Sequence, residues 1–137
     1  MIQAKIQFKL FTDGGSRGNP GPAAIGGVLY QVDKEIANFS KYIGQGTNNQ
    51  AEYNALLTGL ELAKKHKVNN LQCFLDSELV VKQLNKEYRV KDADLAKLFV
   101  KVWNLAQEFA SISFHHVRRE LNKEADRLVN LALDNRK

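Results

Sequence analysis

The sequence offers little for covalent cross-linking or membrane insertion. Its 137 residues include one cysteine and two prolines. No internal disulfide can form, so we expect Cys73, inside the apolar run LQCFL, to be a small core residue in a reducing cytoplasm. No apolar stretch approaches the roughly 20 residues that cross a bilayer, and Met1 leads into a polar segment without a signal-peptide core. We therefore expect a soluble, unprocessed, cytoplasmic protein with no membrane partner.

Acidic residues are also in the minority. Fifteen Asp and Glu stand against twenty Lys and Arg, which leaves a net charge of +5. This balance suits a polyanionic partner, although a merely soluble basic protein would show it too. The chain has 44% apolar residues and no evident internal repeat. Its length and composition predict a single domain over residues 1–137, with no room for a second.

Hydrophobic periodicity predicts the element order βββαβααβα. Ile6, Phe8 and Leu10 alternate with polar residues in a first strand that ends at Asp13. Strands at about 24–32 and 36–43 would complete an antiparallel meander. The other expected elements are a helix from Asn48 or Asn49 to about Lys65, a strand at 71–75, helices at about 77–84 and 93–109, a strand at 112–117 and a last helix capped by Asn122. The expected fold is α/β, a five-stranded mixed sheet flanked by helices.

Four of the few acidic residues fall where a strand ends or a helix begins, in segments that otherwise have a core composition: Asp13, Glu52, Asp76 and Asp126. If these carboxylates converge they need divalent cations, since two charges about 4 Å apart repel by about 4 kcal/mol at an effective dielectric of about 20. Oxygen donors favour Mg²⁺ or Mn²⁺ over zinc. Local roles remain open, because Glu52 can favour a helix dipole and Asp76 can cap a helix.

The segment from Gly14 to Pro22 holds four of the nine glycines and both prolines. Glycines let the backbone approach a ligand, and exposed N–H groups can meet phosphate or ribose oxygens. A rigid turn between strands is the alternative. Further along, the run from Thr47 to Gln50 offers neutral donors and acceptors that suit base edges and 2′-hydroxyls in a minor groove.

Four segments in this order, FTDGGSRGNPGPAA, TNNQAEYNAL, FLDSELVVKQL and RELNKEADRLV, closely resemble the ribonuclease H type 1 family. The resemblance extends from Lys9 to about Leu133. It implies the ribonuclease H-like fold and an endonuclease that hydrolyses the RNA strand of RNA–DNA hybrids by two-metal-ion catalysis, leaving 5′-phosphate and 3′-hydroxyl ends. It also implies two Mg²⁺ ions, with Mn²⁺ as a substitute, held by the four carboxylates. The implied partner is the hybrid duplex, bound by a monomer.

The same resemblance implies which residues contact the substrate. The glycine-rich segment and the helix start would contact the hybrid through Gly14, Gly15, Ser16, Arg17, Asn19, Asn49 and Gln50. Arg118 and Arg119 are expected to bind phosphates.

Two departures separate this chain from the best-known bacterial members. Those members carry a mobile loop with a histidine before the last helix, where this chain has a short segment with Glu120, so we expect Glu120 to assist product release or metal positioning unless it is simply a solvated acid. They also carry a basic protrusion that grips DNA, which a brief segment at 85–91 replaces here. This pattern resembles short archaeal and some bacterial variants, some of which cut double-stranded RNA.

Two other functions remain open on the same scaffold. One is a different nuclease, such as a junction resolvase, and the other is a catalytically silent nucleic-acid-binding module. The intact carboxylate set disfavours the silent module, and the Asn-Asn-Gln helix start favours a substrate with 2′-hydroxyls over an all-DNA junction.

Overall fold

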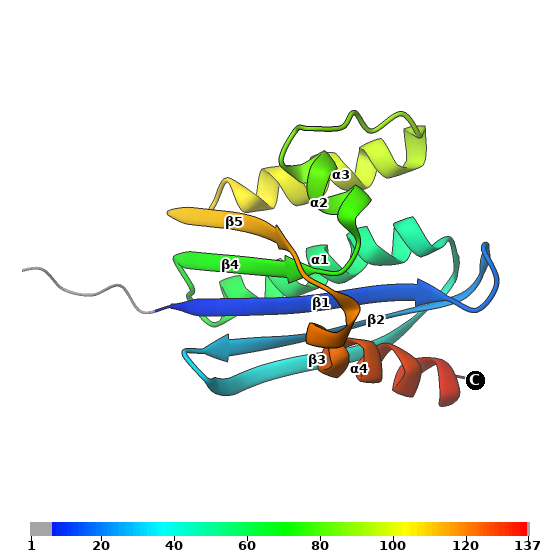
Figure 1. Ribbon diagram of the computed structural model, residues 1–137, viewed down its shortest axis with the longest axis horizontal. Coiled ribbons are helices and arrows are strands. Elements are labelled where there is room, and N and C mark those ends of the chain that lie inside the picture. Colours follow the sequence, from blue (N-terminus) through cyan, green and yellow to red (C-terminus); the bar gives the residue numbers. More distant parts are fainter. Residues whose placement is uncertain (1–6, 137) are drawn as a thin grey trace, which may run out of the picture.

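A computed structural model describes residues 7–136, and in it five strands form one mixed sheet (Figure 1). The spatial order is β3-β2-β1-β4-β5. The strands are β1 (Phe8–Ser16), β2 (Gly21–Gln31), β3 (Lys34–Gly46), β4 (Asn70–Leu75) and β5 (Ser111–His116). The helices are α1 (Asn48–Lys65), α2 (Glu78–Leu84), α3 (Ala93–Ala106), the short 3₁₀ turn η1 (Arg119–Leu121) and α4 (Lys123–Asp134). The predicted α/β fold and element order are confirmed, with η1 as an unpredicted addition.

Strand direction brings chemically important ends together. β1 to β3 pair antiparallel, whereas β4 pairs parallel with both β1 and β5. The carboxyl ends of β1, β4 and β5 therefore lie at one edge of the sheet, where ligand sites of open α/β sheets gather.

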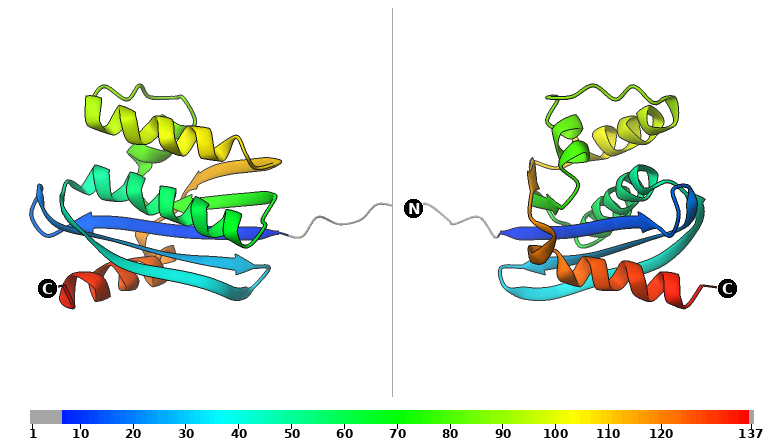
Figure 2. Two further views of the ribbon diagram at one scale, coloured as in Figure 1. Left: turned by 180° about the vertical axis from the view of Figure 1, so that it is seen from behind. Right: turned by 45° about the vertical axis from the view of Figure 1, so that its right-hand side comes forward.

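The helices cover the two faces of the sheet unequally (Figure 2). α1, α2 and α3 cover one face, and their apolar residues form the main core with β1 and β4, around fully buried Leu10, Leu56, Cys73, Val80 and Val102. α4 lies on the opposite face against β2 and β3, where Ala24, Val129 and Leu133 form a small second cluster. Only glycine at position 26 permits this approach, because a Cβ there would lie 2.6 Å from the Ala125 carbonyl oxygen.

Three predicted boundaries are wrong. β1 does not end at Asp13 but continues through Gly14 and Gly15 to Ser16, paired with β2, so only residues 17–20 form the turn. Thr47, rather than Asn48 or Asn49, caps α1 and forms a capping box with Gln50. The second long helix, α3, ends at Ala106. Ile6, predicted to begin the first strand, lies outside the described residues.

Two residues also differ from their predicted local roles. Glu52 lies beyond the first turn of α1, which contains no acidic residue, so it is not placed to favour the helix dipole. Asn122 occupies the N-cap position of α4, but its side chain makes no capping hydrogen bond. Within residues 7–136, no helix combines the length and apolar character needed to span a membrane.

Candidate active site

Asp13 and Glu52 meet because β1 and α1 pack closely at Gly14. A Cβ on Gly14 would overlap the Ala51 carbonyl group, so only glycine allows this approach. The Gly14 N–H donates to Glu52 Oε1 at 2.7 Å. Asp13 and Glu52 are 6% and 5% exposed, so the sheet and the helix together hold two carboxylates almost out of solvent.

Asp76 follows β4 at the same edge of the sheet. Its local alternative, capping α2, is not used, since the Ser77 side chain accepts the hydrogen bond from the Val80 N–H. Instead, Asp76 Oδ2 accepts a hydrogen bond from Asn122 Nδ2 at 3.2 Å. The carboxylate is therefore turned toward the end of β1 rather than toward the helix that follows it.

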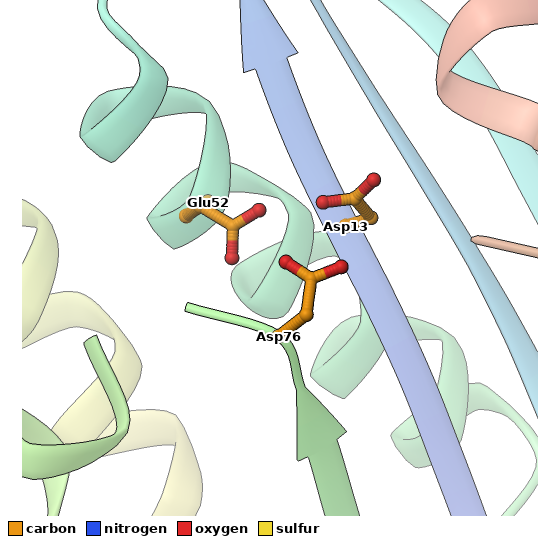
Figure 3. A group of neighbouring side chains, drawn as sticks. All are labelled: Asp13, Glu52 and Asp76. Atoms are coloured by element: carbon orange, nitrogen blue, oxygen red, sulfur yellow. The ribbon is translucent and has the colours of Figure 1, made fainter. Parts of the chain in front are cut away.

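Asp13, Glu52 and Asp76 form an acidic cluster in which each offers an oxygen within 4.8 Å of the others (Figure 3). No lysine or arginine of the described chain forms an ion pair with any of them. Glu52 Oε2 is buried without a hydrogen-bond partner. A buried carboxylate oxygen left in this state is costly, so the cluster fits a bound divalent cation.

Burial shifts the protonation of the cluster. It raises the pKa of Asp13 from the ordinary 3.8 to about 7, with repulsion from Asp76 and Asp126 in the same direction. Burial also raises the pKa of Glu52 well above its ordinary value, and the neighbouring Asp13 adds to the shift. Without a cation, this pair keeps a proton into the neutral pH range; a divalent cation would displace it.

Asp126, from α4, lines an open hollow of about 320 Å³ together with the cluster, and its carboxyl group is close enough to Asp13 to help raise the pKa of that residue. Asp126 is half-buried and lies outside the group of oxygens within 4.8 Å. The other predicted site residues that line this hollow are Gly14, Gly15, Ser16, Arg17, Asn49 and Arg119. We call it the carboxylate hollow.

Several predicted substrate contacts have partners within the protein. Arg17 forms an ion pair with Asp134 at 2.7 Å, which ties the β1–β2 turn to the end of α4. Asn19 Oδ1 accepts from the Asn48 N–H at 3.0 Å, and Gln50 Oε1 accepts from the Thr47 N–H at 2.9 Å. Asn19 and Gln50 do not line the carboxylate hollow, although Gln50 lines a neighbouring groove beside β3.

The remaining predicted site residues, in the segment before α4, do not all reach the hollow. Arg119 lines the carboxylate hollow, whereas Arg118 and Glu120 do not, and all three are exposed. The structure therefore gives Arg119 access to a ligand in the hollow and leaves Glu120 without a contact to it.

Two residues have a role in the site that was not predicted from the sequence. Asn48 Oδ1 accepts from the Ser16 N–H at 2.9 Å and from Ser16 Oγ at 3.1 Å, which joins the start of α1 to β1. The polar run from Thr47 to Gln50 was expected to contact the substrate, but not to bond to β1. Asn122, which contacts Asp76, was expected only to cap a helix, and no sequence pattern distinguishes these roles.

Comparison with known proteins agrees with this architecture. The family model described as Reverse transcriptase-like matches residues 11–132. The ribonuclease HI of Halobacterium salinarum is 45% identical over 125 residues, which are 90% of this chain and 63% of that protein. The bifunctional protein Rv2228c of Mycobacterium tuberculosis is 44% identical over 124 residues, 89% of this chain and 34% of that protein. The chain thus spans about a third of the length of the mycobacterial relative.

Solved structures extend the match. The crystal structure of the Halobacterium salinarum ribonuclease H1 superposes with a TM-score of 0.92 at 42% identity, over 95% of this chain and 99% of that one. LC11-RNase H1 in complex with an RNA/DNA hybrid gives a TM-score of 0.89 at 39% identity, over 93% and 96% of the two chains. Since sequence and fold agree with ribonucleases H1 over nearly the whole described length, the chain belongs to the ribonuclease H type 1 family.

Proposed function

We propose that this chain is an endoribonuclease that hydrolyses the RNA strand of RNA–DNA hybrids. The observation that carries the proposal is the acidic cluster, three carboxylates within 4.8 Å of one another and without a basic partner. Support for the substrate comes from LC11-RNase H1, which shares 39% identity and binds an RNA/DNA hybrid in its crystal structure. The products would be 5′-phosphate and 3′-hydroxyl ends.

The residues present fit the cations that this activity requires. All ligands are carboxylate oxygens, which suits Mg²⁺ with Mn²⁺ as a substitute. Asp13, Glu52 and Asp76 would hold the cations from the cluster side and Asp126 from α4, and we propose two ions. When bound, such cations stabilise the charge that develops on the oxygens of the phosphodiester during displacement.

The protein's own residues prepare the hollow for a nucleic acid. The Gly14 N–H fixes Glu52, and Asn122 fixes Asp76, so both carboxylates are positioned before substrate arrives. Arg119 at the rim is available to a phosphate, whereas Arg17 is engaged by Asp134. We therefore propose Arg119 as the main phosphate contact and Arg118, its neighbour in the sequence, as a second one. Arg17 is proposed to contact the substrate while it keeps its ion pair with Asp134.

Recognition of ribose is proposed for the residues from β1 and the start of α1. Gly15, Ser16 and Asn49 line the hollow, and Gln50 lies in the adjoining groove. These groups form neutral hydrogen bonds, which suit 2′-hydroxyls and the base edges of a minor groove. They do not suit the reading of base sequence, which depends mainly on contacts in a major groove. Asn19 would contribute indirectly, since its side chain fixes the Asn48 N–H at the start of α1.

The wider setting of the protein follows the same proposal. We infer one domain over residues 1–137, acting as a monomer. A reducing compartment such as the cytoplasm suits the fully buried Cys73 thiol, whose pKa burial raises.

One assay tests this function directly. The chain is incubated with labelled RNA–DNA hybrid, duplex RNA, duplex DNA, a DNA junction and duplex DNA with a single ribonucleotide, each with Mg²⁺ and with chelator. We expect Mg²⁺-dependent cuts at many positions in the hybrid, none in DNA, and little at the lone ribonucleotide, because each missing 2′-hydroxyl contact costs about 1 kcal/mol. Cutting of the junction alone would replace the proposal with a resolvase, and cutting of duplex RNA would widen the substrate class.

A further inference from the structure

Asn122 occupies an unusual place for a buried amide. It lies between η1 and α4, it is 1% exposed, and it is among the largest fully buried side chains of residues 7–136. Asparagine at a helix N-cap normally bonds to the helix's own N–H groups. Here it makes no such bond, so helix capping does not account for this side chain.

The amide instead joins three elements. Nδ2 donates to the Thr12 carbonyl oxygen of β1 at 2.9 Å and to Asp76 Oδ2, after β4, at 3.2 Å. An amide nitrogen has two protons, so both are used. Oδ1 is buried without a partner. Leaving that oxygen unpaired costs free energy, which indicates that the position of the Nδ2 donor, rather than full satisfaction of the side chain, is what this site maintains.

The donor is also suited to a cation site by being neutral. In the described chain, the hydrogen bond from Asn122 is the only one found to Asp76, and no lysine or arginine pairs with this carboxylate. A basic side chain here would orient Asp76 but neutralise it, and would compete with a divalent ion. The amide orients one carboxylate oxygen while the full negative charge remains.

The backbone of Asn122 also fixes the position of Asp126 in the first turn of α4. The Asp126 N–H donates to the Asn122 carbonyl oxygen at 3.1 Å, the first helical hydrogen bond of α4. The side chain of Asn122 thus holds Asp76 while its backbone holds the turn that carries Asp126. One residue connects the acidic cluster to the carboxylate on the other side of the hollow.

We propose that Asn122 is a positioning residue for the cation site, which orients Asp76 and registers α4, with Asp126, against the acidic cluster. The inference rests on the proposed function only in assuming that the carboxylates bind divalent cations. It adds a residue of this chain that contacts neither substrate nor reacting atoms.

The test compares Asn122→Ala with Asn85→Ala as a matched control. Asn85 Nδ2 also donates to a strand carbonyl, that of Phe114 at 3.2 Å, but no bond joins it to a carboxylate. Mn²⁺ and Mg²⁺ binding is measured by calorimetry, and hybrid cleavage is measured over a range of Mg²⁺ concentrations. We expect Asn122→Ala to weaken cation binding about tenfold and to lower kcat about tenfold at limiting Mg²⁺. Saturating Mg²⁺ should restore much of kcat, and KM for the hybrid should not change.

The Asn85→Ala protein should lose stability without a change in cation affinity. Should Asn122→Ala fail to fold, Asn122→Ser, whose hydroxyl can donate one bond, carries the same comparison with a smaller loss. Wild-type cation affinity in a folded Asn122 variant would overturn the inference, even if activity fell. If the wild type binds cations but cuts no hybrid, the proposed function fails, and the calorimetric comparison still decides the role of Asn122.

Discussion

The two sides of the carboxylate hollow hold their acidic residues by different means. Asp13, Glu52 and Asp76 belong to β1, α1 and the end of β4, which pack together through the main core. Asp126 belongs to α4, which packs through a cluster of Ala24, Val129 and Leu133. The first three lie within 4.8 Å of one another, and Asp126 does not join them.

This contrast shows which parts of the site are fixed by the fold itself. On the sheet side, backbone contacts such as the close approach at Gly14 set the carboxylates. On the α4 side, the helix also approaches the sheet closely, at Gly26, but Asp126 lies near the start of the helix, where the buried side chain of Asn122 ties it to β1. The Arg17–Asp134 ion pair near the end of α4 is exposed and adds little. We therefore expect substitutions on the sheet side to cause large losses of activity or stability, and substitutions on the α4 side to cause smaller, partial losses.

The largest expected effect compares Asp13→Asn with Asp126→Asn. Asp13 is buried at the centre of the cluster, so its loss should lower kcat for hybrid cleavage on the order of a thousandfold. Asp126→Asn should cost about ten- to a hundredfold, with partial recovery at high Mg²⁺. Steady-state cleavage with matched circular dichroism spectra checks both. Equal losses would remove the contrast, and wild-type turnover by Asp13→Asn would contradict the site.

The next effect concerns the backbone contact on the sheet side. Gly14→Ala would force a Cβ into the Ala51 carbonyl, which cannot move without separating β1 from α1. We expect a loss of about 3 kcal/mol in the free energy of unfolding, near the upper end for overpacking. Gly15→Ala is the control, because its nearest atom is Asn48 Oδ1 at 3.8 Å. Urea unfolding without cations should separate the two variants; similar midpoints would show that the approach is not tight.

A smaller effect is the pH dependence of the cation-free protein. The raised pKa values of Asp13, about 7, and of Glu52 mean that the folded chain holds more protons than the unfolded chain above about pH 4. The stability that Asp13 contributes should therefore fall between about pH 4 and 7, by at most about 1.4 kcal/mol per pH unit for each proton, and should be lost above the folded pKa of about 7. Asp13→Asn should flatten the slope, and Mg²⁺ should reverse it. A wild-type slope in Asp13→Asn would show that other groups cause it.

The fold was predictable because its signals are local. Alternation of apolar residues marked β1, strand-like runs marked β2 and β3, and the helical stripe of Ala55, Leu56 and Ala63 marked α1; these elements are present in the structure, and the residues of the stripe are buried. The extension of β1 was missed because Gly14 and Gly15 have low strand propensity. Their pairing with Ile25 and Ala24 depends on β2, a contact that no local pattern reports.

The site was predictable only in part for a related reason. Residue type and motif order indicated the carboxylates, but not which ones lie closest together. Asn122 illustrates the limit, because an asparagine before a helix looks like a cap whichever group its amide contacts. Its bonds reach Thr12 and Asp76, 110 and 46 residues away in the sequence. Such distant partners become visible only when the sheet brings them together.

The smallest expected effect concerns Glu120, in η1 just before α4. Glu120 is exposed and does not line the carboxylate hollow, so Glu120→Ala should change turnover by no more than about twofold, the range of an ordinary surface substitution. Arg119→Ala is the matched comparison, since Arg119 lines the hollow one residue earlier. Its loss should raise KM several-fold, increasingly at low salt, because a phosphate contact is lost. A tenfold fall in turnover for Glu120→Ala, with KM unchanged, would restore the role in product release or metal positioning expected from the sequence. It would also require η1 to bring Glu120 into the hollow when substrate is bound, so the α4 side would rearrange while the sheet side stayed fixed.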